Sequence, residues 1–210
     1  MLRYTLAVLV LWVVNPELRR LYDWRFGHSS VELLAAVPLL ALIPHCWSLT
    51  VGGRWQRVPG LLSVPAWLWI SAFAYALVVA FLSGNFLPAS YTFAKFVLPL
   101  SIGLWIVSDA DTFASAYQRV TRVLFALTTI VSVYGIIQYV VAPPWDALWV
   151  HNLFEQGTAN SFGRPYPFQI RVFSMLSSPG PFGNFMALML LLALPELSLR
   201  RPKLLAQVPL

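Results

Sequence analysis

The chain has 210 residues, of which 59% are hydrophobic and only 10% are charged. Soluble domains carry about 25% charged residues, so this chain has too few charges to cover a water-exposed surface, and an ordinary soluble protein is excluded. Its net charge of +6 at pH 7 does not indicate a nucleic-acid partner, because the basic residues lie between apolar segments and form no basic face with stacking aromatic side chains. The composition therefore predicts an all-α, polytopic membrane protein that contacts membrane lipids.

The apolar segments predict about six transmembrane helices, since a bilayer core of about 30 Å needs roughly 20 apolar residues of helix. In chain order, the expected spans are residues 4–14, 33–51, 61–82, 91–108, 123–142 and 172–195. The first span is short. The fourth contains Lys95, and because a charge inside a membrane is costly, we treat Lys95 as a candidate cavity-lining residue. Residues 1–210 are expected to form a single transmembrane domain, and residues 204–210 to open a seventh span.

Loop charges predict how these spans are oriented. Eight basic residues fall on one side of the six-span arrangement and five on the other, and the more basic side of a membrane protein usually faces the cytoplasm. Both termini are thus expected in the cytoplasm. The 29-residue segment 143–171 then faces outward, and long loops with polar residues of their own often carry function.

Several polar side chains have an ordinary structural interpretation. His45, in the second expected span, fits a hydrogen-bonded helix contact. His151 and Glu155, in the outward loop, could act as acid or base, but without a visible partner they fit loop polar residues better. Five charged residues after the first span are expected to pair among themselves at the surface: Glu17, Arg19, Arg20, Asp23 and Arg25.

The last apolar segment contains a helix-breaking pattern. Pro179 and Pro181 lack backbone donors and restrict the residues before them. We therefore expect the last transmembrane helix to be broken near residues 179–181, into a short segment that ends near Ser178 and a helix that begins near Phe182. A broken helix at membrane depth is tolerated where it lines a cavity.

Arg171 lies shortly before this expected break. Free N–H groups at the start of a helix suit an anion, and an arginine can bind a phosphate through two parallel hydrogen bonds. A pocket for a diphosphate or a carboxylate is one interpretation, with Ser178, Gly180 and Asn184 as further candidates for lining it. The other interpretation is that Arg171 reaches to the membrane interface and that the prolines form a structural kink.

Five short motifs occur along the chain: residues 15–20 (NPELRR), 22–27 (YDWRFG), 134–139 (YGIIQY), 171–174 (RVFS) and 178–182 (SPGPF). With the tryptophan-containing loop before the fourth motif, their order and spacing resemble the bacterial O-antigen ligase/polymerase family, in particular its exopolysaccharide-type members. The likeness covers essentially the whole chain.

The resemblance implies a membrane glycosyltransferase of the bacterial inner membrane, which transfers a glycan from a polyprenyl-diphosphate lipid to a lipid or glycan acceptor. The products of such enzymes are cell-surface polysaccharides, including lipopolysaccharide and exopolysaccharide. Arg171, and less closely Arg164, match the basic residues that bind the diphosphate in this family, where cations stabilise the charge that develops on the leaving group. The resemblance requires no metal or other cofactor.

The resemblance also implies that the chain is the N-terminal half of a longer enzyme, whose catalytic residues lie in the other half, so that this half alone is expected to be inactive. Two other classes of protein fit the same residues. A transporter or flippase for lipid-linked sugars would have a similar broken helix and similar basic residues at its cavity. A membrane scaffold without chemistry is the third interpretation.

Overall fold

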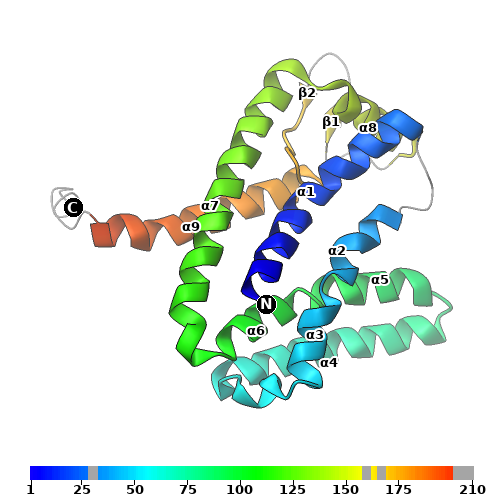
Figure 1. Cartoon of the computed structure of the whole chain (residues 1–210). Coiled ribbons are helices and arrows are strands. Elements are labelled where there is room, and N and C mark those ends of the chain that lie inside the picture. The colour runs from blue at the N-terminus through cyan, green and yellow to red at the C-terminus, as the bar shows by residue number, and fades with distance from the viewer. Residues whose placement is uncertain (28–32, 158–161, 165–168, 201–210) are drawn as a thin grey trace, which may run out of the picture. The chain divides into compact units, whose positions relative to one another are not determined.

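The computed structural model describes residues 1–27, 33–157, 162–164 and 169–200, and this part of the chain is mostly helical (Figure 1). Its first elements are α1 (Leu2–Phe26), the 3-10 helix η1 (Leu33–Ala36), α2 (Val37–Leu40), α3 (Ile43–Thr50), η2 (Arg54–Arg57), α4 (Gly60–Leu82), α5 (Phe86–Val97) and α6 (Leu100–Val107). They are followed by α7 (Ala110–Val141), α8 (Pro144–Glu155), β1 (Gly163–Arg164), β2 (Gln169–Ile170) and α9 (Pro179–Arg200). The expected seventh span, residues 204–210, lies outside the described residues.

Three helical segments of the described chain are long and apolar enough to cross a membrane: Gly60–Leu82, Phe86–Val107 and Phe113–Val141. Each overlaps one of the spans expected from the sequence, so the prediction of a mostly helical chain with helices of membrane-spanning length is confirmed for these segments. Two further expected spans form shorter apolar helices instead, Leu34–Thr50 and Pro179–Ala193. The total of six spans stays a prediction.

The chain forms two compact units, which are described separately. The first unit contains Met1–Leu11 and Glu32–Thr121, and the second contains Trp12–Val31 and Arg122–Leu210. Helices α1 and α7 therefore contribute residues to both units.

The core of the first unit lies among α3, α4 and α6, with five buried apolar residues: Leu49, Val58, Ala66, Leu104 and Trp105. The start of α1 contacts this unit through polar groups. The hydroxyl of Thr5 lies 2.9 Å from His45 Nε2, and both side chains are buried. The hydroxyl of Tyr4 donates to the carbonyl oxygen of Ala41 at 2.6 Å. His45 is thus a hydrogen-bonded helix contact, as its place in an apolar segment predicts.

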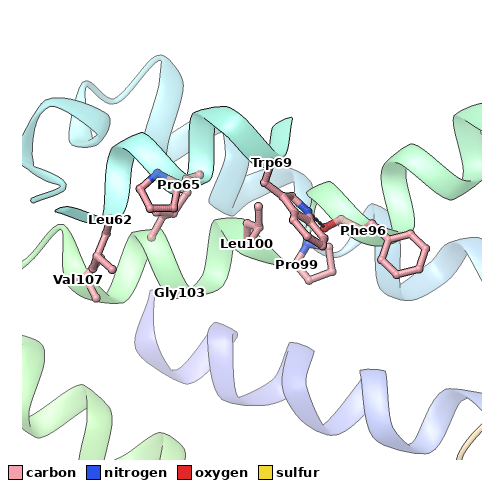
Figure 2. Close-up of a pocket in the computed structure, with 10 residues that line it drawn as sticks. Leu62, Pro65, Trp69, Phe96, Pro99, Leu100, Gly103 and Val107 are labelled. Atoms are coloured by element: carbon pink, nitrogen blue, oxygen red, sulfur yellow. Dashed lines mark hydrogen bonds between the residues drawn. The ribbon is translucent and has the colours of Figure 1, made fainter. Parts of the chain in front are cut away.

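Helix α4 packs alongside α5 in the first unit (Figure 1), and a cavity of about 620 Å³ lies between α4 and the stretch from α5 to α6 (Figure 2). The indole nitrogen of Trp69 donates to the carbonyl oxygen of Phe96 at 3.2 Å across it. The residues that line the cavity are Leu62, Pro65, Ala66, Trp69, Phe96, Pro99, Leu100, Gly103, Leu104 and Val107. None of these carries a charge, so the cavity offers no cation to a phosphate. Lys95 is exposed and is not one of the lining residues.

The core of the second unit surrounds α7. One group of buried apolar residues packs α1 and α7 against the segment before α9: Val13, Leu127, Val131 and Leu176. A second group joins α8 to the segments on both sides of the β-hairpin, and it consists of Val150, Phe162 and Phe173. Phe162 and Phe173 contact each other edge to face, with ring centroids 5.2 Å apart.

Segment 143–171, expected as an outward loop, contains regular structure. Helix α8 begins at Pro144, a residue that suits the first turn of a helix because its missing N–H would have no partner there. Strands β1 and β2 form an antiparallel pair, with Gly163 opposite Ile170 and Arg164 opposite Gln169. Whether this segment faces outward stays a prediction.

The last apolar segment differs from its expectation of two helical pieces. Residues before Pro179 form turns and bends, and α9 begins at Pro179 instead of near Phe182. The reason is that proline is compatible with the first turn of a helix, where no intrahelical donor is needed. The prolines therefore start a helix and do not interrupt one. Phe182 N then donates to Ser178 O at 3.2 Å, as the first regular hydrogen bond of α9.

Candidate functional site

Six side chains meet in a buried polar cluster of the second unit, which we call the Arg20 cluster. They come in pairs from three helices: Glu17 and Arg20 from α1, Tyr134 and Gln138 from α7, and Trp145 and Asp146 from α8. On α1 and α7 the paired residues are three or four positions apart, a spacing that places side chains on one face of a helix. The relative exposure of Arg20 is 1% and that of Asp146 is 0%.

Arg20 contacts both carboxylates and two backbone carbonyls. Its Nε donates to Glu17 Oε2 at 3.1 Å and lies 2.8 Å from Asp146 Oδ1, and a terminal nitrogen also donates to Glu17. Its terminal nitrogens donate to Leu176 O at 2.8 Å and to Ser174 O at 2.6 Å. A buried charge is stable only when it is paired and hydrogen-bonded. These contacts supply both, and they attach the segment before α9 to α1.

Tyr134 lies between the two carboxylates. Its hydroxyl oxygen is 2.5 Å from Glu17 Oε1 and 2.8 Å from Asp146 Oδ2. The indole N–H of Trp145 points at the same place, with Nε1 2.6 Å from Glu17 Oε1 and 2.7 Å from the Tyr134 hydroxyl. Helices α1, α7 and α8 are thus joined through one tyrosine hydroxyl.

Gln138 connects the charges to a backbone turn. Its amide nitrogen donates to Asp146 Oδ2 at 2.7 Å, and its amide oxygen accepts from the backbone N–H groups of Phe173, at 2.9 Å, and Ser174, at 2.8 Å. Ser174 has a φ of 52°, a conformation uncommon outside glycine. Its hydroxyl donates to Val131 O at 2.5 Å. The side chain of Gln138 and the α7 backbone therefore fix a turn that would otherwise be unfavourable.

The electrostatics of the cluster make Asp146 harder to ionise than an exposed carboxyl group. Burial raises the pKa of Asp146 to about 6, and the carboxylate of Glu17 acts in the same direction, whereas the positive charge of Arg20 lowers this pKa. The cluster holds one cation and two carboxyl groups, so full ionisation would leave a net negative charge in a buried place.

The Arg20 cluster has a structural role, and two of its side chains, Arg20 and Asp146, are closed to solvent. Its chemical effect is on the turn that contains Ser174. Three residues before this turn the chain passes through Arg171, and five residues after it α9 begins. The cluster thereby positions the stretch for which the sequence predicts a diphosphate site.

Arg171 and Arg164, the predicted diphosphate ligands, lie on the hairpin that leads into this stretch. Arg171 is exposed and directly follows β2, and its backbone N–H donates to Phe162 O at 2.8 Å. Within the described part of the chain, its guanidinium makes no hydrogen bond or ion pair. Arg164 lies in β1, opposite Gln169. In this register Arg171 lies opposite Phe162, so the backbones of the two arginines lie at opposite ends of the same small sheet.

The other predicted cavity residues fall in different places. Ser178 is half-buried and directly precedes α9, whereas Gly180 and Asn184 are exposed in its first turns. The start of α9 is a poorer anion site than expected, because its two prolines have no N–H group and leave Gly180 as a donor in that turn. Lys95 is exposed on α5, in the first unit, and the other candidates belong to the second.

The prediction that the charged residues after the first span pair at the surface is wrong for three of them, because Glu17, Arg20 and Asp23 are buried. Arg20 and Glu17 do pair, but their relative exposures are 1% and 5%. Arg25 is exposed, as predicted. In contrast, His151 and Glu155 form an exposed pair on α8, with His151 Nε2 3.1 Å from Glu155 Oε1, which agrees with their interpretation as surface polar residues.

The residues missed by the sequence analysis are Tyr134, Gln138, Trp145 and Asp146. A signal was present for two of them: Tyr134 and Gln138 are polar, lie four positions apart and fall near the end of an otherwise apolar segment. Polar groups at helical spacing in an apolar helix need an internal partner. No local pattern relates Asp146 to Arg20, because their contact depends on tertiary structure.

Comparison with protein-family models, curated proteins and solved structures finds no match to this chain. The resemblance of its motifs to the O-antigen ligase/polymerase family therefore stays a prediction. The candidate site rests on the geometry of the second unit alone.

Gly135 offers a test of the packing beside the cluster. A Cβ atom added to Gly135 would lie 3.1 Å from Val172 Cγ1, 3.5 Å from Phe182 Cζ and 3.6 Å from Ser174 Cβ. We expect Gly135→Leu to lower the free energy of unfolding by about 1–3 kcal/mol, because overpacking forces the turn away from α7. Chemical unfolding in detergent measures this change.

The matched control for this variant is Gly183→Leu, on α9. An added Cβ at Gly183 meets nothing within 4 Å, so the substitution should be neutral or slightly stabilising, since leucine has the better helix propensity. If both leucines were equally tolerated, the close contact between α7 and the turn would not exist in solution.

Proposed function

We propose that this chain is part of the machinery of a membrane glycosyltransferase of the O-antigen ligase/polymerase type. It would transfer or polymerise polyprenyl-diphosphate-linked glycans at the outer face of the bacterial inner membrane, in the synthesis of cell-surface polysaccharide. The donor is the lipid-linked glycan, and the acceptor is a lipid or another glycan chain.

The observation that carries this proposal is Arg171. It is exposed, its backbone is held by Phe162 on one side and by the turn at Ser174 on the other, and its guanidinium has no partner among the described residues. A guanidinium that is free of internal partners but fixed at its backbone is suited to bind a phosphate group from outside the chain. The apolar helices supply the membrane setting that a polyprenyl lipid needs.

The chemistry assigned to Arg171 is electrostatic. When the acceptor attacks the anomeric carbon of the donor, the bond to the diphosphate breaks and negative charge develops on the leaving oxygen. A positioned cation stabilises this charge more in the transition state than in the ground state, which is the condition for acceleration. No metal ion is needed if arginine side chains supply the positive charge.

The proposal predicts the outcome of Arg171→Ala in the complete protein, expressed in cells that lack the wild-type gene. Loss of one transition-state contact of this kind typically slows a reaction by about 100-fold or more, so we expect the polysaccharide product to fall to background while the protein remains in the membrane. Gel analysis of the extracted polysaccharide, with an immunoblot of the membranes, measures both quantities.

Arg57→Ala is the matched control, because Arg57 is also exposed but lies on η2 in the first unit. Its product should be unchanged. A normal polysaccharide yield from Arg171→Ala would overturn the assignment of Arg171.

A flippase for lipid-linked sugars is the competing function. The face of the inner membrane on which the lipid-linked glycan accumulates distinguishes a transferase from a flippase. A cell without the transferase should accumulate lipid-linked glycan on the outer face of the inner membrane, where a non-permeant glycosidase digests it in spheroplasts. A cell without a flippase should accumulate it on the cytoplasmic face, protected from the enzyme. Protection would reject the transferase.

A further inference from the structure

The Arg20 cluster contains more hydrogen-bonding contacts than its known hydrogens can serve. Tyr134 has one hydroxyl hydrogen, and an ionised carboxylate only accepts. Yet the hydroxyl oxygen of Tyr134 lies within hydrogen-bonding distance of Glu17, at 2.5 Å, and of Asp146, at 2.8 Å. With both carboxylates ionised, one of these short O···O contacts would have no hydrogen in it.

The neighbouring donors do not supply this hydrogen. The indole N–H of Trp145 points at Glu17 and at the Tyr134 hydroxyl, and the amide of Gln138 donates to Asp146 but not to Tyr134. Tyr134 has the shorter contact with Glu17, so its hydrogen belongs there. The contact between Tyr134 and Asp146 then needs a hydrogen that Asp146 itself carries.

The charges lead to the same arrangement. Around Asp146, α1 presents Glu17 and Arg20, and α7 presents Tyr134 and the neutral Gln138. From the described turn before α9, the cluster meets backbone groups and the ring of Phe173, none of which is charged. One arginine and one ionised carboxylate make a neutral pair. A second ionised carboxylate would leave a net buried negative charge, which is costly.

We propose that the Arg20 cluster is a proton-binding site, in which one exchangeable proton lies on Asp146 Oδ2 and is donated to the hydroxyl oxygen of Tyr134. The cluster is then neutral, and both short contacts between the Tyr134 hydroxyl and the carboxyl groups contain a hydrogen. This inference goes beyond the proposed function and does not depend on it.

The proton is one that the protein can lose near neutral pH, since burial raises the pKa of Asp146 to about 6. Because this pKa is higher in the folded than in the unfolded chain, where it is 3.8, the stabilisation by Asp146 is fully present below about pH 4 and is lost as the pH rises through about 6. Above that pH, the deprotonated cluster holds the Ser174 turn less firmly.

Infrared difference spectroscopy of the full chain in liposomes tests the site directly, because a protonated carboxylic acid has a carbonyl band of its own that shifts in heavy water. On acidification from about pH 8 to about pH 5, which is above the usual range of exposed carboxyl groups, the wild type should gain this band with a midpoint near pH 6. Asp146→Asn should lack the band. This variant keeps the shape of the side chain, and its amide N–H can donate to Tyr134 as the acid does, although its amide nitrogen cannot accept the hydrogen bond from Gln138.

Glu155→Gln is the matched control, since Glu155 is 65% exposed, and it should keep the band. A wild type without the band, or an Asp146→Asn variant that retains it, would overturn the proposal.

Tyr134→Phe is a second, independent test of the proposal, and it remains valid if Asp146→Asn does not fold. It removes the acceptor of the proton, so the midpoint should move to lower pH. If Tyr134 instead donated to an ionised Asp146, its removal would raise the midpoint, and that result would also overturn the proposal.

Discussion

Replacing Arg20 with methionine is expected to lower the free energy of unfolding by about 3–5 kcal/mol, since removing one member of a buried ion pair leaves its partner charged and uncompensated. Methionine keeps much of the length and volume of the side chain but none of its donors. Glu17 loses its ion-pair partner, and the carbonyl oxygens of Ser174 and Leu176 lose their hydrogen bonds. Denaturant unfolding in detergent micelles, followed by far-ultraviolet circular dichroism, measures the change in free energy.

Arg25→Met is the control for this prediction, because Arg25 lies on the same helix and is exposed. Substitutions at exposed positions usually change stability by no more than about 0.5 kcal/mol. Equal effects of the two substitutions would show that Arg20 does not attach α1 to the segment before α9.

Gln138→Leu is expected to lower the free energy of unfolding by about 2–4 kcal/mol. Each buried donor left without an acceptor costs about 1–3 kcal/mol, and this substitution leaves the N–H groups of Phe173 and Ser174 without one. The apolar leucine offsets part of the cost. Hydrogen exchange measured by mass spectrometry should show faster exchange in the peptide that contains these two residues, with little change elsewhere.

The corresponding control is Gln56→Leu, because Gln56 is exposed on η2. Its stability and its exchange pattern should match the wild type. Unchanged exchange at Phe173 and Ser174 in Gln138→Leu would contradict the role of Gln138 as the acceptor that fixes this turn.

The membrane-spanning helices could be predicted from the sequence because apolar length is a local property. The segment around Trp69 and the segment around Leu127 have no charged residue for about 20 positions, and both form long helices. Helix α9 shows where the same rule is insufficient. Pro179 was expected to follow a break within a span, but proline at the first position of a helix is favourable, and sequence alone does not show on which side of a proline a helix lies.

The candidate site also has a part that the local sequence predicts and a part that depends on contacts between distant residues. The candidate role of Arg171 is predicted from its own chemistry and its position before the prolines. The structure shows that Arg171 is exposed, and its role in binding stays a prediction. Arg20 was expected at the surface because arginine is rarely buried. Its burial depends on Asp146 and on the carbonyl of Leu176, which are far from it in sequence. Long-range pairs of this kind leave no periodic pattern.

The separation of these residues along the chain has a consequence for biosynthesis. The hydrogen bond from Arg20 to Leu176 O joins residues 156 positions apart. At a synthesis rate of about 5–20 residues per second, Leu176 is added roughly 8–30 s after Arg20. During that interval Glu17, only three residues away, is the partner already present for Arg20. The local ion pair with Glu17 is therefore expected to supply a counterion for Arg20 until the segment that contains Leu176 has been made.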